Sequence, residues 1–311
     1  MAGNEAVPLK KRIERSVGGA ALRSLAAVVR RLPDGMAERF GKSVGRLLFR
    51  LSRKYRSRAL SNLAMCFPEW SSQKVHATAV GVFEHFGRLM VQFFRFDRVS
   101  DQQILDSVEF EGLEAIEAAL DKGKGALVVT AHFGDWERMA HSVAIRGKKI
   151  SVVARDSNEE RTTKLVNSVR KRHGIDVFSR GRAAREILRR LAANEIVGIL
   201  TDQNTREILV PFFGIPAGTN EAPAALHLRL GTPLFTAFCA EIAPGRYRAV
   251  VEPVTFTPRN ESRERDVVEI MSLINERIER AVRERPEQWL WMHDRWRWTR
   301  ELGLLEKAKT P

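Results

Sequence analysis

The sequence predicts a mixed α/β fold with a largely parallel central sheet flanked by helices, preceded by an N-terminal amphipathic helical region. The first observation is an alternation that starts near residue 108, where short apolar runs typical of buried strands are separated by segments of helical periodicity. The expected strands are 125–131, 150–154, 196–201 and 233–241, and the expected helices are 136–146, 158–173, 181–193 and 264–285. Helices that connect consecutive buried strands favour parallel pairing.

The second observation is the bulk composition. With 311 residues, of which 44% are hydrophobic, the chain is long and apolar enough to form a full core, which excludes a disordered protein. Two cysteines cannot form a disulfide framework, so we expect a reducing compartment. We expect a basic helical region over residues 1–60, an α/β domain over 61–300 and a tail over 301–311.

The third observation is the uneven distribution of a net charge of +14: residues 1–60 hold 15 lysines and arginines but only four acids. Within this region an apolar stripe at helical spacing has cations between its members. The stripe consists of Met36, Phe40, Val44, Leu47, Leu48 and Leu51. Such a helix can lie in a membrane interface with its cations on anionic headgroups, or it can pack on the core with its charged face in solvent.

Neither a secretory signal nor a membrane-spanning segment is expected from the sequence. The first apolar stretch is short and is interrupted by Arg23, and no run approaches the roughly 20 apolar residues that cross a bilayer. Membrane contact by this chain would therefore be peripheral.

The stretch "GALVVTAHFGDWERMA" (125–140) holds the main candidate site. His132 follows a predicted strand, and Glu137 comes five residues later. In one regular helix such residues would point about 140° apart, so they can meet only if a turn separates them. Gly134 and the potential N-cap Asp135 supply that turn, and open α/β sheets place their sites at the carboxyl ends of strands.

A histidine beside a carboxylate can act as a general base. The carboxylate of Glu137 would fix the imidazole tautomer of His132, which would then take a proton from a substrate hydroxyl. No serine or cysteine stands nearby, which favours direct attack by that hydroxyl. A capping aspartate with an incidental histidine is the simpler reading. A metal site that includes Asp135 and His141 matches no recognised ligand spacing, so no metal and no other cofactor is expected.

The segment "AHFGDWE" (131–137) resembles the His-x4-Asp/Glu motif of the lysophospholipid acyltransferase superfamily, and further blocks resemble the bacterial lipid A late acyltransferase family. These blocks are "ALSNLAMCFPEWS" (59–71), "VVARDSNE" (152–159), the "DQ…PFFG…T" block within 200–233, and "PEQWLWMHDRWRW" (286–298). The resemblance implies transfer of an acyl group from a thioester, on acyl carrier protein or coenzyme A, to a hydroxyl of a lipid A precursor. It also implies a peripheral protein at the cytoplasmic face of the inner membrane.

Five further residues are candidates for substrate binding. Arg155, or backbone N–H groups, would stabilise the developing oxyanion. Asp202 and Gln203 follow a predicted strand, so they either reach the same crevice or stabilise a turn. Phe212 and Phe213 lie in a Gly/Pro-rich loop, where they either contact the acyl chain or pack in the core.

Two other features leave alternatives open. The region 155–190, with 11 basic and five acidic residues, could bind acceptor phosphates, dock an acidic carrier protein or be a solvated face. The segment 286–298 holds four of the six tryptophans, which suits a headgroup-level interface and also nucleic-acid stacking. The alternative functions are acyl transfer to another glycolipid, such as a phosphatidylinositol mannoside, or to a lysophospholipid, and basic nucleic-acid binding. No nucleic-acid motif is present, so nucleic acid is not an expected partner.

Overall fold

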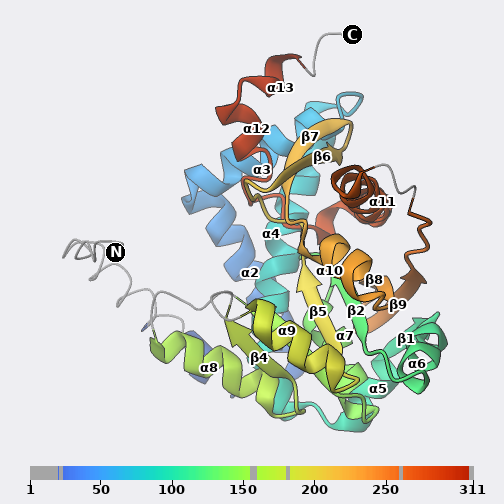
Figure 1. Ribbon diagram of the computed structural model, residues 1–311. Helices are drawn as coiled ribbons and strands as arrows, with labels where there is room; N and C mark the ends of the chain where they lie inside the picture. The colour runs from blue at the N-terminus through green and yellow to red at the C-terminus, as the bar shows by residue number, and fades with distance from the viewer. Residues whose placement is uncertain (1–19, 21–23, 155–159, 180–182, 259–261, 308–311) are drawn as a thin grey trace.

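The computed structural model describes residues 20, 24–154, 160–179, 183–258 and 262–307. Its centre is a seven-stranded sheet in the order β1-β9-β8-β2-β5-β3-β4 (Figure 1). The strands are β1 (Val108–Glu111), β2 (Ala126–Thr130), β3 (Ile150–Ala154), β4 (Asp176–Ser179), β5 (Ile196–Leu200), β8 (Leu234–Ala243) and β9 (Arg246–Pro253). Every pairing is parallel except β8 with β9, so the predicted mixed, largely parallel sheet is confirmed.

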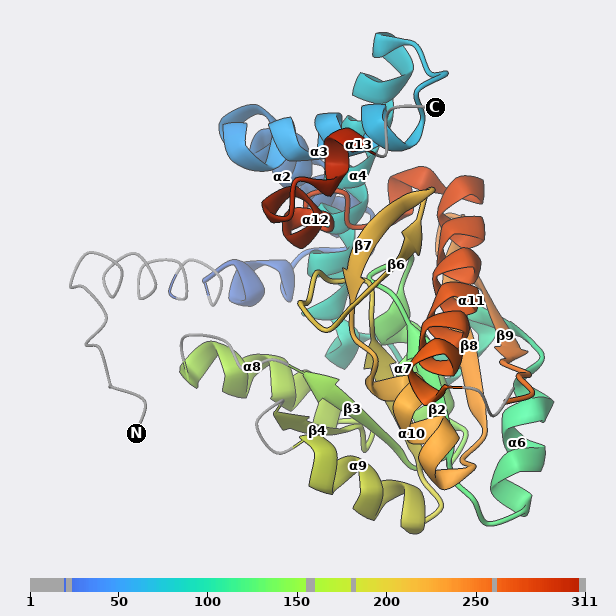
Figure 2. The same cartoon turned by 45° about the horizontal axis from the view of Figure 1, so that its top comes forward.

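Helices cover both faces of this sheet (Figures 1 and 2). Leu127 and Val129 of β2 pack in the larger core, whereas Ala126 and Val128 pack in the core of the opposite face. The helices that contribute buried residues to the larger core include α9 (Ala183–Ala192), α10 (Ala222–Leu230) and α11 (Arg263–Glu284). The opposite core includes α6 (Leu113–Asp121) and α7 (Trp136–Ile145). A strand buried on both faces explains the continuous apolar runs in the sequence.

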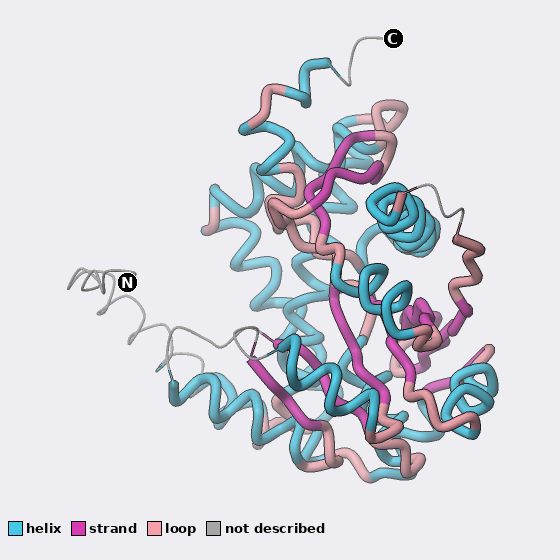
Figure 3. The backbone as a smooth tube through the Cα atoms, viewed as in Figure 1, coloured by secondary structure: helices cyan, strands magenta, loops and turns pink. Residues whose placement is uncertain are grey.

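The N-terminal part is helical. It comprises α2 (Asp34–Leu51), α3 (Arg53–Cys66), α4 (Ser72–Phe93) and, after a single 3-10 turn, α5 (Asp101–Ser107). The fold is completed by α8 (Glu160–Lys171) between β3 and β4, and by the short helices α12 (Arg297–Glu301) and α13 (Leu304–Lys307) (Figure 3). Among the described residues, no helix combines the length and hydrophobicity required to span a bilayer.

Helix α2 packs on α4 through Ala37, Gly41, Gly45 and Phe49, whose ring contacts Phe83. The backbones approach so closely at Gly41 and Gly45 that a Cβ on Gly45 would lie 2.1 Å from a carbonyl oxygen of α4. Several large members of the predicted apolar stripe are consequently exposed to solvent. They are Met36, Leu47, Leu48 and Leu51, of which Leu51 is 72% exposed.

The segment that follows β5 forms a separate antiparallel hairpin of β6 (Ile208–Phe212) and β7 (Ile215–Thr219). The prediction of a loop for Phe212 is therefore wrong, because this residue pairs with Ile215 in the hairpin. The expectation that the C-terminal tryptophans form a surface interface is also wrong for three of the four. Trp289, Trp291 and Trp296 are 0% exposed and pack on the hairpin as core residues.

Candidate active site

A tight turn connects β2 to α7 and sets the position of His132. Gly134 has a φ of 57°, and a Cβ at this residue would lie 1.8 Å from the carbonyl oxygen of Cys239, so only glycine fits. Asp135 caps α7 by accepting a hydrogen bond from the backbone N–H of Arg138 at 2.8 Å. The predicted turn and N-cap are confirmed, and they place His132 before the helix and Glu137 in its first turn.

The carboxylate that contacts the His132 ring is that of Asp202. The His132 Nδ1 lies 2.8 Å from the Asp202 Oδ1, and the backbone N–H of His132 donates to the Oδ2 at 2.9 Å. A third donor, the indole Nε1–H of Trp289, reaches the same Oδ2 at 2.9 Å. The pairing of β2 with β5 sets Thr130 beside Leu200, so the residues that follow each strand meet at the edge of the sheet.

The charge of Asp202 is stabilised although the side chain is buried. Burial alone would raise the pKa of this carboxyl, but the His132 charge and the hydrogen bonds from His132 and Trp289 outweigh it and hold the pKa below its ordinary value. An ionised carboxylate only accepts hydrogen bonds, so the His132 Nδ1 carries the hydrogen. With the Nδ1 hydrogen facing Asp202, the Nε2 is the ring atom that can take up a proton.

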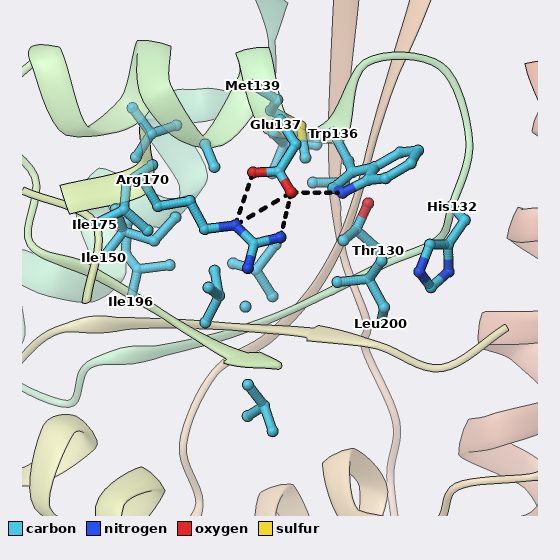
Figure 4. Close-up of a pocket in the computed structure, with 18 of the residues that line it drawn as sticks. Thr130, His132, Trp136, Glu137, Met139, Ile150, Arg170, Ile175, Ile196 and Leu200 are labelled. Carbon is cyan, nitrogen blue, oxygen red and sulfur yellow. Dashed lines mark hydrogen bonds and ion pairs between the residues drawn. The ribbon is translucent and has the colours of Figure 1, made fainter. Parts of the chain in front are cut away.

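Glu137 has different partners from those expected. Its carboxylate accepts hydrogen bonds from Arg170 of α8, with the Arg170 Nε 3.0 Å from the Glu137 Oε2, and from the indole of Trp136 at 3.2 Å (Figure 4). Among the hydrogen bonds of the described residues, none joins Glu137 to His132. The orienting role that the sequence suggested for Glu137 therefore falls geometrically to Asp202. Glu137 instead holds Trp136, whose ring packs edge-on to His132 with centroids 5.1 Å apart.

His132 lies at a cavity of about 560 Å³, within the usual range of small-molecule sites. The cavity extends between the sheet and the α7 and α8 side of the molecule. Its polar lining includes His132, Glu137, Arg170, Gln203 and His293. Most of its lining is aliphatic, including residues of β2, β3 and β5, with Ile150, Ile175 and Ile196 on the far side of the ion pair from His132 in Figure 4.

His293 is a site residue that the sequence reasoning missed. Its Nε2 accepts a hydrogen bond from the backbone N–H of Asn204 at 3.0 Å, which leaves the hydrogen on Nδ1. Burial, assisted by the positive charge of Arg295, lowers the pKa of His293 to about 4, so the ring is neutral near pH 7. The residue lies in the segment 286–298, where the tryptophans were the more conspicuous signal.

The remaining predicted residues have different positions. Gln203 lines the cavity beside His293. Phe212 and Phe213 do not; Phe212 packs on Trp289 with ring centroids 5.3 Å apart, and Phe213 packs on Trp291 at 5.6 Å. These two rings stabilise the wall that carries Trp289 and are not placed for acyl contact. Arg155 lies outside the described residues.

The residues of the alternative metal reading are engaged separately. Asp135 forms an ion pair with Arg138, with 3.1 Å between the carboxylate oxygen and the Nε. The Nδ1 of His141 lies 2.7 Å from the Nδ1 of His173. In the part of the chain that the structure describes, no group of three or more histidine, cysteine or acidic side chains is arranged to hold a metal ion.

His132, paired with a buried carboxylate, lies beside a largely aliphatic cavity at the carboxyl edge of a mostly parallel sheet, and this arrangement is typical of an α/β enzyme. Residues 15–298 match the model of the bacterial lipid A biosynthesis acyltransferase family. The chain belongs to this family and is an O-acyltransferase.

Similarity to curated relatives extends over most of the chain. It is 26% identical to a lipid A biosynthesis acyltransferase of Haemophilus influenzae, over 86% of this chain and 82% of the relative. It is 25% identical to the lipid A biosynthesis myristoyltransferase of Escherichia coli, over 89% of this chain and 84% of the relative. A phosphatidylinositol mannoside acyltransferase of Mycobacterium tuberculosis is 25% identical over 68% of each chain.

Proposed function

We propose that this enzyme transfers a fatty acyl group from an acyl thioester, carried by acyl carrier protein or coenzyme A, to a hydroxyl of a lipid A precursor. The observation that carries this proposal is the His132–Asp202 pair at a cavity whose lining is mostly aliphatic. Such a cavity takes an acyl chain by removing its apolar surface from water. The thioester carbonyl then lies at the mouth, beside the base.

The proposed reaction needs one base and no covalent enzyme intermediate. The His132 Nε2 takes the proton from the acceptor hydroxyl as its oxygen attacks the thioester carbonyl carbon. Collapse of the tetrahedral intermediate breaks the carbon–sulfur bond, forms the ester and releases the thiolate, which receives the proton from His132. Asp202 keeps the ring oriented and stabilises the imidazolium between these steps.

Two neighbouring groups complete the proposed site. The His293 Nδ1–H is a neutral donor at the same cavity, and with Arg155 or backbone N–H groups it would stabilise the oxyanion. Glu137 acts as a positioning residue: it holds the Trp136 ring against His132 and neutralises Arg170. Gln203 lies beside them and would contact the substrate.

The acceptor would approach from the side of α2. A second apolar groove of about 560 Å³ shares His293 with the first cavity and includes Leu48, Tyr55 and Met90. Leu48 is one of the exposed leucines of α2, and these leucines belong to the strongly basic region 1–60. We propose that residues 1–60 rest on anionic lipids of the inner membrane at its cytoplasmic face, so that the groove receives the acceptor lipid.

The test is transfer of a labelled acyl group from acyl carrier protein to a purified lipid A precursor in mixed micelles. The wild-type protein should form the ester, and His132→Ala should abolish ester formation while it retains the wild-type circular dichroism spectrum. Near-normal turnover by His132→Ala would remove His132 from the chemistry. Parallel reactions with a phosphatidylinositol mannoside and a lysophospholipid decide the acceptor, because a higher rate on either would overturn the assignment to lipid A.

A further inference from the structure

The cavity beside His132 has a glycine, Gly198, on the side formed by the sheet. Three residues of β5 line the cavity, and they are Ile196, Gly198 and Leu200, which share one face of the strand. The isoleucine and the leucine fill space beside their own backbone. Gly198, between them, leaves a notch in the middle of the strand.

No close backbone approach requires glycine at this position. A Cβ on Gly198 would lie 3.3 Å from the Val152 Cγ1 and 3.8 Å from the Ser151 carbonyl oxygen, and it would meet no other atom within 4 Å. By contrast, a Cβ on Gly134 would overlap the backbone. A glycine inside a strand destabilises the fold by roughly 0.5–1 kcal/mol relative to alanine, and often marks a site where a ligand approaches closely. A Cβ at Gly198 would therefore press on the Val152 side chain but on no backbone atom, and its absence widens the cavity beside this strand.

The notch lies well inside the cavity. Val128 of β2 is the pairing partner of Gly198, and His132 comes four residues after Val128. At about 3.3 Å per residue along a strand, the notch is about 13 Å from the level of His132. Long acyl chains attached at the mouth reach this depth, whereas short ones do not.

The charged side of the cavity favours a path of the acyl chain along the sheet. The ion pair of Glu137 and Arg170 lines the cavity between His132 and the three isoleucines Ile150, Ile175 and Ile196 (Figure 4). An acyl chain gains nothing by covering these charges and would strip them of water. The aliphatic surface of β2, β3 and β5 offers the more favourable contact.

We propose that Gly198 determines which acyl chain lengths this enzyme accepts, by leaving room for the distal methylenes of the bound chain. This inference rests on the proposed acyl-transfer function and adds a specificity-determining residue to it. Val152 is the neighbour that a larger residue at 198 would press against, so these two positions together set the width of the notch.

The experiment compares wild type with Gly198→Ala and Gly198→Val, using octanoyl, decanoyl, lauroyl, myristoyl and palmitoyl carrier protein as donors. We expect kcat/KM on the short donors to stay near the wild-type value. On the longest donor that wild type uses well, Gly198→Ala should lower kcat/KM roughly 10-fold, since one methylene in an apolar pocket changes kcat/KM by about that factor or more. Gly198→Val should lower it further. An equal loss on all donors, or an unchanged chain-length profile in both variants, overturns the proposal.

Two further variants distinguish loss of space in the notch from general destabilisation of the fold. Gly198→Ala combined with Val152→Ala removes the Val152 Cγ1 methyl group that the new Cβ would meet, and should restore activity on the longer donors. Gly35→Ala, where a Cβ has nothing within 4 Å, should leave the profile unchanged. If the double variant does not recover the longer donors, while its thermal unfolding matches that of Gly198→Ala, the notch is not the determinant.

A measurement of fatty-acid binding tests the role of Gly198 separately from acyl transfer. Displacement of a fluorescent fatty acid by decanoate, laurate, myristate and palmitate reports the cavity without any transfer. If wild type transfers no acyl group, the proposed function fails. A Gly198→Val protein that still loses affinity selectively for the longer acids supports the notch in that case, and an unselective change overturns it.

Discussion

Replacement of Asp202 by asparagine tests how the structure controls the base. Two donors, the backbone N–H of His132 and the Trp289 indole, converge on the Asp202 Oδ2. In Asp202→Asn the amide oxygen must occupy this place, because an NH₂ group cannot accept hydrogen bonds. The NH₂ group then faces the His132 Nδ1 and donates to it. The ring hydrogen is thereby forced onto Nε2, the atom that in the proposed reaction takes the proton from the acceptor.

The size of the effect follows from this change of tautomer. Loss of the correct tautomer in a histidine–aspartate pair lowers turnover by about 10⁴-fold in a well-studied hydrolase, so we expect a decrease of about 10³–10⁴-fold, or ~4–5.5 kcal/mol in the activation barrier. The fold should persist, because both hydrogen bonds to the Oδ2 position are retained. The defect should therefore lie in turnover and not in the amount of folded protein.

The assay is single-turnover transfer of a labelled acyl group to the glycolipid acceptor, with enzyme in excess over the thioester. Asp294→Asn is the matched control, since Asp294 forms ion pairs with Arg58 and Arg300 near the surface and should retain turnover. A rate for Asp202→Asn within tenfold of wild type, in a protein with an unchanged unfolding temperature, would refute the reasoning about the tautomer.

Three further outcomes are expected. Glu137→Gln should lower both turnover and the free energy of unfolding measured in urea, because it leaves the buried Arg170 charge unpaired. A double variant with Arg170→Met should recover part of each loss; if it is instead as inactive as Asp202→Asn, Glu137 acts directly on His132. Burial, with the neighbouring Arg88 cation, lowers the pKa of His85 to about 4 from an ordinary 6.5, so between these pH values the unfolded chain binds a proton that the folded protein does not, and the free energy of unfolding falls as the pH drops. His85→Gln should reduce the slope of the free energy of unfolding against pH by up to about 1.4 kcal/mol per pH unit, and an unchanged slope in urea titrations would contradict this. Gly45→Ala should destabilise the protein by roughly 1–3 kcal/mol in the same titrations, because α2 must move away from α4, whereas Gly35→Ala should not.

The strands that the sequence predicts well are those buried on both faces. The expected strand at 150–154 matches β3, and those at 125–131 and 196–201 each extend one residue at most beyond β2 and β5. Strands β1 and β4 were not predicted because each has only four residues and includes charged or polar ones. Strand β9 alternates exposed and buried residues over most of its length and contains two arginines, so it lacks the long apolar run that identified the others.

The site was harder to predict because the order of the strands in a sheet cannot be inferred from local sequence patterns. His132 was found from its position after a strand, and Glu137 was the nearest acid in sequence. The structure brings in Asp202 from 70 residues away because β5, and not a strand closer in sequence, is paired with β2. Asp202 was a candidate for the crevice from its place after a strand, but its pairing with His132 was not predicted. Arg170 gave no signal, since it is one of many cations on α8 and its neighbours.

The hydrogen bond from Trp289 to Asp202 makes the site depend on a segment far along the chain. The two residues are 87 positions apart, and the same C-terminal segment binds the turn before α7, where the Gln288 carbonyl accepts from the Gly134 N–H at 3.0 Å. One short segment around residue 289 therefore contacts both the turn after His132 and the carboxylate that holds its ring. Removal of this segment would take away both contacts at once, together with the His293 side of the cavity.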